Sequence, residues 1–177
     1  FANDTYAGAP SVDYMEFTAN GFIPKSNNGG TNGNGSDYIY MAIRRPNREE
    51  FDPEELFATS IGQSDDPSFV GGFPVDMGIH TKPGSDGFSR SVVTRMTEKT
   101  LYTEVNAAEI VAENGFDYMD GYIKNQYMDA SWQSWMWRRA PGHFDVVCYE
   151  GDGQADRKVP HNLGVVPEMM WVKTRSE

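Results

Sequence analysis

The residue types that most often carry catalysis are present in this chain, but their spacing is not that of a catalytic or metal site. The three histidines, His80, His143 and His161, are far apart and lack the close spacing that brings two imidazoles to one zinc ion. Asp and Glu are abundant, so a carboxylate pair for glycoside hydrolysis can be chosen in many ways, but no motif selects one pair. We therefore predict no catalytic residues and no enzyme.

Sites for other ions and for nucleotides are also poorly indicated. Asp65-Asp66, and Asp117 with Asp120, offer oxygens to Ca²⁺, yet neither pair has the ligand spacing of a calcium-binding loop. No glycine-rich loop follows a strand and opens a helix, which is the arrangement that holds nucleotide phosphates. The sequence predicts no metal and no cofactor.

Aromatic residues are the stronger candidates for ligand binding, because flat apolar rings stack on sugars. The chain has four tryptophans. Trp135, Trp137 and Trp171 occupy positions at which hydrophobic residues recur, so we expect them in the core. Trp132 and Tyr127 lie on a more polar edge and are the candidate ligand-binding residues.

Two arginine pairs, Arg44-Arg45 and Arg138-Arg139, follow the aromatic stretches. An arginine can hold the carboxylate of an acidic sugar through two parallel hydrogen bonds. It can equally neutralise neighbouring carboxylates where a strand ends, and we favour this structural role in a chain so acidic.

Composition narrows the range of partners. A net charge of −11 argues against nucleic acid and anionic membranes as partners, because both attract basic surfaces. No apolar stretch approaches the roughly 20 residues of a membrane span. The single cysteine, Cys148, lies in an apolar run, which predicts a small buried hydrophobic residue and no internal disulfide.

The stretch that carries these aromatic and arginine residues occurs twice in similar form. Residues 37–46 read DYIYMAIRRP and residues 131–141 read SWQSWMWRRAP, with their arginine pairs 94 residues apart. Asn114-Gly115-Phe116 repeats Asn20-Gly21-Phe22 at the same offset. Self-similarity at a fixed period indicates a repeat architecture.

Two further matches indicate where each copy of the repeat begins and ends. Phe51-Asp52 corresponds to Phe144-Asp145, and residues 72–79 resemble residues 164–172. We predict an internal repeat of about 94 residues, with residues 47–141 as the complete central copy. Residues 1–46 are then the back half of a first repeat, and residues 142–177 the front half of a following one. On this interpretation the sequence is a piece of a longer repeated protein.

The elements that position these residues are predicted to be strands. Residues 38–43 are apolar on both faces, which is typical of a central strand covered twice. Residues 56–61 follow a helix-like start but are predicted as a strand, and residues 25–36 as an exposed polar loop. The fold class is all-β. We expect an antiparallel β-sandwich, jelly-roll or lectin-like, in which two stacked copies cover each other's apolar faces.

Several short sequence segments, taken in order, resemble a repeat of tailed-bacteriophage virion proteins, chiefly tail fibres and neighbouring structural proteins. The segments that match are FDVVCYEGDG at residues 144–153 and HNLGVVPEMMWVK at residues 161–173. Two shorter segments also match, LYT at residues 101–103 and YIYMAIR at residues 38–44. The resemblance covers most of the chain except residues 76–100, and the tryptophan-rich second aromatic stretch departs from the usual pattern.

The resemblance implies a viral structural protein of the virion, with no catalytic residues to carry over. Its task would be assembly, through other copies of itself and other virion proteins, and recognition of a host-surface component, for which we expect a glycan. Such proteins are usually homo-oligomers, and fibres are often trimers. The alternative is a capsid decoration or filament-forming protein whose exposed strand edges pair with neighbours. A second, weaker alternative is a polysaccharide-degrading enzyme.

Overall fold

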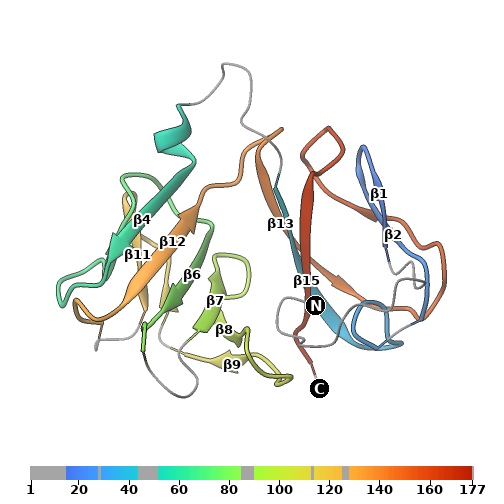
Figure 1. The fold of residues 1–177 in the computed structure, drawn as a ribbon, viewed down its shortest axis with the longest axis horizontal. Coiled ribbons are helices and arrows are strands. Elements are labelled where there is room, and N and C mark those ends of the chain that lie inside the picture. The colour runs from blue at the N-terminus through green and yellow to red at the C-terminus, as the bar shows by residue number, and fades with distance from the viewer. Residues whose placement is uncertain are drawn as a thin grey trace. The chain divides into compact units, whose positions relative to one another are not determined.

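The computed structural model describes residues 15–27, 29–43, 52–84, 90–112, 114–124 and 128–176, which form antiparallel β-sheets (Figure 1). These ranges contain fifteen strands, and their only helical element is a single 3₁₀ turn, Pro53–Glu55. The predicted all-β antiparallel class is confirmed. None of the described residues belongs to a helix long and apolar enough to cross a membrane.

The chain divides into two compact units. Unit 1 comprises Phe1–Pro46 and Ala140–Glu177, and unit 2 comprises Asn47–Arg139. Unit 2 is therefore one continuous stretch of chain, whereas unit 1 is made from two stretches that lie on either side of it in the sequence.

Unit 1 contains two three-stranded sheets. One has the order β1-β2-β14 and the other the order β13-β3-β15. The strands are β1 Met15–Thr18, β2 Gly21–Pro24, β3 Asp37–Ile43, β13 Phe144–Glu150, β14 Val159–Pro160 and β15 Met169–Thr174.

The core of unit 1 is rich in tyrosine. Tyr38 and Tyr40 project from β3 on the same side, and Ala42 follows them, as the two-residue period of a strand requires. The edge of the Phe22 ring meets Tyr40, with ring centroids 4.6 Å apart. The other buried members of this core are Tyr149, Val159 and Leu163.

Unit 2 contains a six-stranded sheet with the order β4-β12-β6-β7-β8-β9 and a three-stranded sheet with the order β10-β11-β5. The predicted strand over residues 56–61 is confirmed, because a 3₁₀ turn capped by Asp52 leads directly into β4. The strands are β4 Phe57–Ile61, β5 Phe69–Val70, β6 Met77–Thr81, β7 Arg90–Thr94, β8 Lys99–Tyr102, β9 Ile110–Val111, β10 Asn114–Gly115, β11 Gly121–Lys124 and β12 Gln133–Trp137.

The core of unit 2 is built between its two sheets. Met136 and Val93 come from the six-stranded sheet, and Phe69 and Tyr122 come from the three-stranded one. Phe116 stacks on Tyr122 with ring centroids 5.3 Å apart. Phe73, Val75 and Met128 complete the buried set.

The main sheet of each unit is centred on a strand paired on both sides. In unit 1, Ile43 of β3 lies opposite Phe144 on one side and Met169 on the other. In unit 2, Trp137 of β12 lies between Phe57 and Met77 in the same way.

The residue that precedes each of these methionines makes the same backbone contact. Glu168 N–H donates to the Ile43 carbonyl at 3.0 Å, and Asp76 N–H donates to the Trp137 carbonyl at 2.9 Å. These contacts agree with the predicted correspondence between residues 72–79 and 164–172.

The strand register bears on the FD correspondence expected from the sequence. Phe144 lies opposite Ile43 in unit 1, and Phe57 lies opposite Trp137 in unit 2. Phe51 lies outside the described residues, and Asp52 caps the 3₁₀ turn. The match between Phe51-Asp52 and Phe144-Asp145 therefore stays a prediction.

The NGF match is displaced. Gly21-Phe22 pairs with β14, and the segment that pairs with β5 in unit 2 is Gly121-Tyr122, six residues after Gly115-Phe116.

Gly21 and Gly121 are required by a close approach of two backbones. A Cβ atom at Gly21 would lie 1.8 Å from the Val159 carbonyl oxygen, and one at Gly121 would lie 2.1 Å from the Phe69 carbonyl oxygen. Any side chain at either position must push the neighbouring strand away, because the obstructing atom is backbone.

The polar stretch at residues 25–36 is not the fully exposed loop that we expected. Thr31 and Asn32 are buried, and Tyr149 Oη donates to the Thr31 carbonyl at 2.7 Å. Tyr38 Oη accepts from Gly33 N–H at 2.6 Å. The tyrosine hydroxyls satisfy backbone groups of the loop, so a stretch without apolar side chains can still pack against the core.

Substitution of Gly121 by alanine is expected to lower the free energy of unfolding by about 1–3 kcal/mol or more, because a backbone oxygen occupies the space of the new methyl group. Chemical denaturation monitored by circular dichroism measures this loss. Gly115→Ala is the matched control in the neighbouring strand, since its Cβ would meet Ile123 at an ordinary 3.8 Å. Equal midpoints for the two variants would contradict the proposed steric role of Gly121.

Candidate binding surface

The aromatic strand of unit 2 presents its tryptophans away from the unit 2 core. Ser134 and Met136 of β12 are fully buried, and Met136 belongs to the core cluster. Trp135 and Trp137 alternate with them and are half-buried on the opposite face of the sheet. The expectation that these two tryptophans belong to the core is therefore wrong.

The reason lies in a polar contact that the sequence does not reveal. Ser134 is tolerated in the core because its Oγ lies 2.8 Å from Tyr122 Oη. The two-residue alternation of a strand shows that Trp135 and Trp137 share one face and that Ser134 lies on the other. A polar serine is expected to face solvent, so the sequence suggested that the tryptophans face the core. The buried serine hydroxyl requires a partner and finds one in the facing sheet.

We call the face of the six-stranded sheet that carries Trp135 and Trp137 the outer face. Trp135 lies between Thr59 and Ile79. Ile79 lies opposite Val92, which continues the apolar row onto β7. The next row contains Phe57, Trp137 and Met77.

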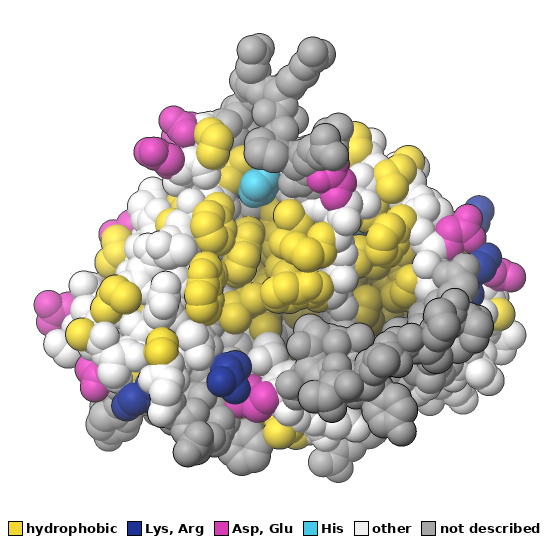
Figure 2. Space-filling view, in the orientation of Figure 1, with side chains coloured by type: hydrophobic (Ala, Val, Ile, Leu, Met, Phe, Trp, Pro, Cys, Tyr) yellow, Lys and Arg dark blue, Asp and Glu magenta, His cyan; other side chains and the backbone are white. Residues whose placement is uncertain are grey.

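Parts of the outer face are accessible. Phe57 is 39% exposed and Ile61 is 56% exposed, while the two tryptophans are half-buried. The Phe57 and Trp137 rings have centroids 5.2 Å apart and are tilted by 50°. On the side shown in Figure 2, hydrophobic side chains gather near the middle of the view, beside β6.

Polar side chains border this aromatic row. Gln133 lies between Ile61 and Thr81, and Thr81 lies opposite Arg90. An apolar platform with a few hydrogen-bonding side chains at its border is the composition typical of small-molecule and sugar sites. The outer face can therefore stack on an apolar ring face and hydrogen-bond to its substituents.

The two residues that the sequence favoured lie elsewhere. Tyr127 is outside the described residues. Trp132 is half-buried and packs against the unit 2 core, with its ring centroid 5.9 Å from that of His80. The structure thus gives Trp132 a packing contact, and it does not bring Trp132 into the rows of the outer face.

Unit 1 has a corresponding apolar face. Met41 of β3 lies between Val146 and Trp171, and Trp171 is 43% exposed. Trp171 was expected in the core, and this exposure contradicts that expectation. Cys148 is half-buried and lies opposite Ile39, so it is less enclosed than the sequence suggested.

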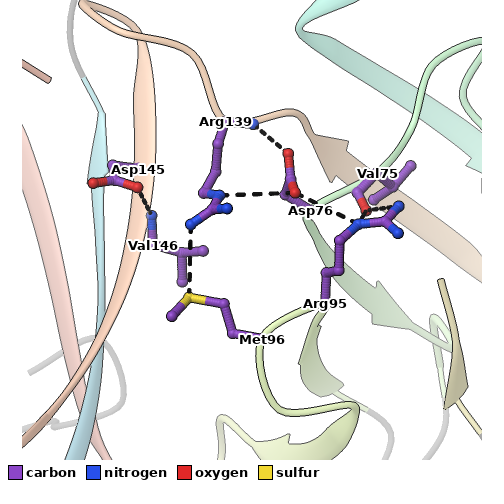
Figure 3. Close-up of polar contacts among 7 residues, drawn as sticks. All are labelled: Val75, Asp76, Arg95, Met96, Arg139, Asp145 and Val146. Carbon is purple, nitrogen blue, oxygen red and sulfur yellow. Dashed lines mark hydrogen bonds and ion pairs between the residues drawn. The ribbon is translucent and has the colours of Figure 1, made fainter. Parts of the chain in front are cut away.

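Arg139, the last residue of the second arginine pair, has a structural role. Arg139 N–H donates to Asp76 Oδ2 at 2.7 Å, and its guanidinium lies 3.7 Å from Asp76 Oδ1 (Figure 3). Arg95 approaches the same carboxylate at 3.5 Å and donates to the Val75 carbonyl. The predicted neutralisation of a carboxylate at the strand end is confirmed for Arg139, whereas Arg44-Arg45 lie outside the described residues.

A buried polar chain crosses the core of unit 2 and was not foreseen. Ser91 Oγ lies 2.7 Å from His80 Nε2, and Tyr122 Oη lies 3.3 Å from His80 Nδ1. Tyr122 in turn contacts Ser134. A serine next to a histidine that contacts a third hydroxyl is the geometry of an activated nucleophile.

Burial argues against that chemistry. Ser91 is 3% exposed and His80 is fully buried, so a substrate has no access to the serine hydroxyl. Burial, together with the nearby charge of Lys124, lowers the pKa of His80 to about 3. The neutral imidazole can donate from one nitrogen and accept at the other, which suits a satisfied core network.

Lys124 is the second buried titratable group of unit 2. It is 8% exposed, and its ammonium donates to Thr100 Oγ1, which also accepts from the Asn114 amide. Burial lowers the pKa of Lys124 to about 8. This amine faces Asn114 across β10 and β11, as their register requires.

The remaining histidines lie in unit 1. His161 Nδ1 accepts from Leu163 N–H at 3.2 Å, so this imidazole caps a turn. Asp145 is buried and accepts from Val146 N–H at 3.0 Å (Figure 3). It also accepts from Asn162 N–H at 2.8 Å. Burial lowers the pKa of His143.

No group of three or more His, Cys, Asp or Glu side chains among the described residues could hold a metal ion. The chain matched no protein-family model, no curated protein and no solved structure. Its function has to be argued from its own residues.

Acidification is expected to destabilise the protein through His80. Between pH 6.5 and pH 3 the unfolded chain binds a proton at this imidazole that the folded chain excludes, so the free energy of unfolding falls as the pH falls. From pH 7 to pH 4 the contribution is on the order of 3 kcal/mol. Denaturant titrations of wild type and His80→Gln across this range measure it.

The variant isolates this contribution because all other titrating groups remain in both proteins. The wild type should lose more stability than His80→Gln on acidification. Parallel pH profiles would show that His80 titrates normally in the folded state.

Proposed function

We propose that this chain is a non-catalytic structural module of a tailed-phage virion, of the tail-fibre kind, which serves particle assembly and recognition of a host-surface glycan. The observation that carries the recognition part is the aromatic outer face of unit 2. It holds Trp135, Trp137 and Phe57 in one register-fixed patch on a hydrogen-bonded sheet. A rigid platform of this kind binds without ordering loops, which lowers the entropic cost of association.

We infer further that the two units are copies of one fold, in which each pairs two sheets as a β-sandwich. Support comes from the pairing order β13-β3-β15 and β4-β12-β6. The smaller sheets agree, since β2 pairs with β1 and β14, and β11 pairs with β10 and β5. The offset of 94 residues between Ile43 and Trp137 is the one that the sequence repeat predicts.

A tyrosine hydroxyl occurs in both cores. Tyr40 of β3 contacts Phe22, and its hydroxyl donates to the Pro160 carbonyl at 2.7 Å. At the corresponding position of unit 2, Ser134 contacts the hydroxyl of Tyr122. Each core thus places one hydroxyl-bearing ring between its two sheets, supplied by β3 in unit 1 and by β11 in unit 2.

Two other functions compete with this proposal. A decoration or filament-forming protein would use the same apolar faces and strand edges to contact neighbouring copies. No observation favours a polysaccharide-degrading enzyme. Glycoside hydrolysis uses a pair of carboxylates, and Ser91 with His80, which resembles a nucleophile and base of another reaction class, is sealed in the core.

Glycan binding by the intact protein is the direct test. A glycan array should identify a ligand for the wild type, and Trp135→Met should weaken binding about tenfold or more, corresponding to about 1.4 kcal/mol. Methionine is the residue that unit 1 carries at this position, Met41, so the packing volume is largely kept while the flat ring is lost. Isothermal titration calorimetry measures the change.

Two control variants locate the site. Trp171→Ile changes the tryptophan of unit 1 to the residue found at Ile79 and should leave binding intact. Trp132→Tyr tests the edge that the sequence favoured. Loss of binding in Trp132→Tyr with normal binding in Trp135→Met would move the site to that edge, and an array without any hit would reject the recognition role.

A further inference from the structure

Unit 1 is assembled from two stretches of chain that unit 2 separates in the sequence. The first stretch supplies β1, β2 and β3, and the second supplies β13, β14 and β15. Strand β3 lies between β13 and β15, and β2 lies between β1 and β14 (Figure 1). Both sheets of unit 1 therefore contain strands from both stretches.

The hydrophobic core that the described residues of unit 1 form is shared between the two stretches. Tyr149 of the second stretch stacks on Tyr38 of the first, with centroids 5.2 Å apart, and meets Phe22 at 5.5 Å. Val159 and Leu163 come from the second stretch and complete the same cluster. Separation of the stretches would expose all these apolar side chains to water.

Hydrogen bonds also cross between the stretches. Tyr149 Oη donates to the Thr31 carbonyl at 2.7 Å, and Asn32 Nδ2 donates to the Gln154 carbonyl at 2.6 Å. His161 N–H donates to the Asn20 carbonyl at 2.7 Å. Each stretch alone would leave partners of these bonds unsatisfied.

These contacts depend only on the two stretches and not on whether one chain supplies both. The second stretch can therefore make the same contacts with the first stretch of another molecule, which is the condition for domain swapping. Unit 2 differs in this respect, because residues 47–139 form a single continuous stretch.

We propose that unit 1 is a head-to-tail joint between copies of this chain, in which β13, β14 and β15 of one copy complete β1, β2 and β3 of the next. Each stretch of unit 1 is then completed by the other stretch of a second copy of the chain. A contact between two different surfaces of the same molecule closes into a ring or extends into a filament. This proposal rests on the assembly role proposed above but not on glycan recognition.

Cross-strand cysteines distinguish closure within one chain from joining of two. Cys148 of β13 lies directly opposite Ile39 of β3, and Ile39→Cys would complete the pair. Directly opposed residues in antiparallel strands have Cα atoms about 4.5–5.5 Å apart, which suits a disulfide. After mild oxidation of the purified protein over a concentration series, a non-reducing denaturing gel separates linked multimers from monomers.

The expected result is a set of disulfide-linked dimers and higher multimers whose share rises with protein concentration. Monomers with an internal disulfide at every concentration would overturn the proposal. A mixture of two chains makes the test more specific. One chain carries Ile39→Cys and Cys148→Ser, and the other is the wild type, which supplies Cys148. When the two are refolded together, the designed disulfide can form only between two different molecules.

The matched control is the corresponding pair of unit 2. Ile61 and Gln133 lie opposite each other in β4 and β12, and the variant Ile61→Cys, Gln133→Cys, Cys148→Ser should give monomers only. If Ile39→Cys fails to fold, as judged by circular dichroism, Ile43→Cys with Met169→Cys in the Cys148→Ser background repeats the test on β15. Because no glycan is involved, failure of the joint is distinguishable from failure of recognition.

Discussion

The pairing of one central strand on both of its sides is the constraint from which the rest of each unit follows. Strand β3 in unit 1 and β12 in unit 2 hydrogen-bond to neighbours on both edges, so their register cannot slip without moving every side chain to the wrong face. One face of the strand is thereby committed to the tyrosine or methionine core. The other face is also apolar, and it carries the half-buried Trp135 in unit 2 and the buried Met41 in unit 1.

The smaller sheet of unit 2 and the sheet β1-β2-β14 of unit 1 contain close backbone contacts that leave no room for displacement. Gly21 and Gly121 bring a carbonyl of the paired strand in the same sheet into the space of a side chain. Tyr38, Tyr149 and Tyr122 then use hydroxyls to satisfy buried polar groups at a distance from their own backbones. Polar contacts specify the packing in both units, while apolar burial supplies most of its free energy.

Much of this could be predicted from the sequence because strand alternation and turn residues are local signals. The all-β class, the doubly covered strand at residues 38–43 and the strand after the turn at Asp52 were all accessible in this way. Orientation was not, because alternation shows which residues share a face but not which face meets the core. Ser134 reversed the expected orientation through its contact with Tyr122, a partner in another sheet.

The NGF match could not be placed from the sequence for a similar reason, because strand pairing depends on long-range contacts. Gly115-Phe116 matches Gly21-Phe22 in letters, whereas Gly121-Tyr122 matches it in pairing, and only long-range contacts separate the two. The buried loop at Thr31 and Asn32 was missed because its stabilising partner, Tyr149, is distant in the sequence. Tyr127 lies outside the described residues, so its proposed role stays a prediction.

The different partners of β3 and β12 have a consequence for how the two units are kept distinct. Ser134 of β12 has its hydroxyl satisfied by Tyr122 of β11. A hybrid that set β12 against β2 would place Ser134 beside Phe22, which has no hydroxyl, and would leave a void and an unsatisfied hydroxyl. Such a mispairing is costly, so each unit is expected to keep its own strands although both lie in one chain at high effective concentration.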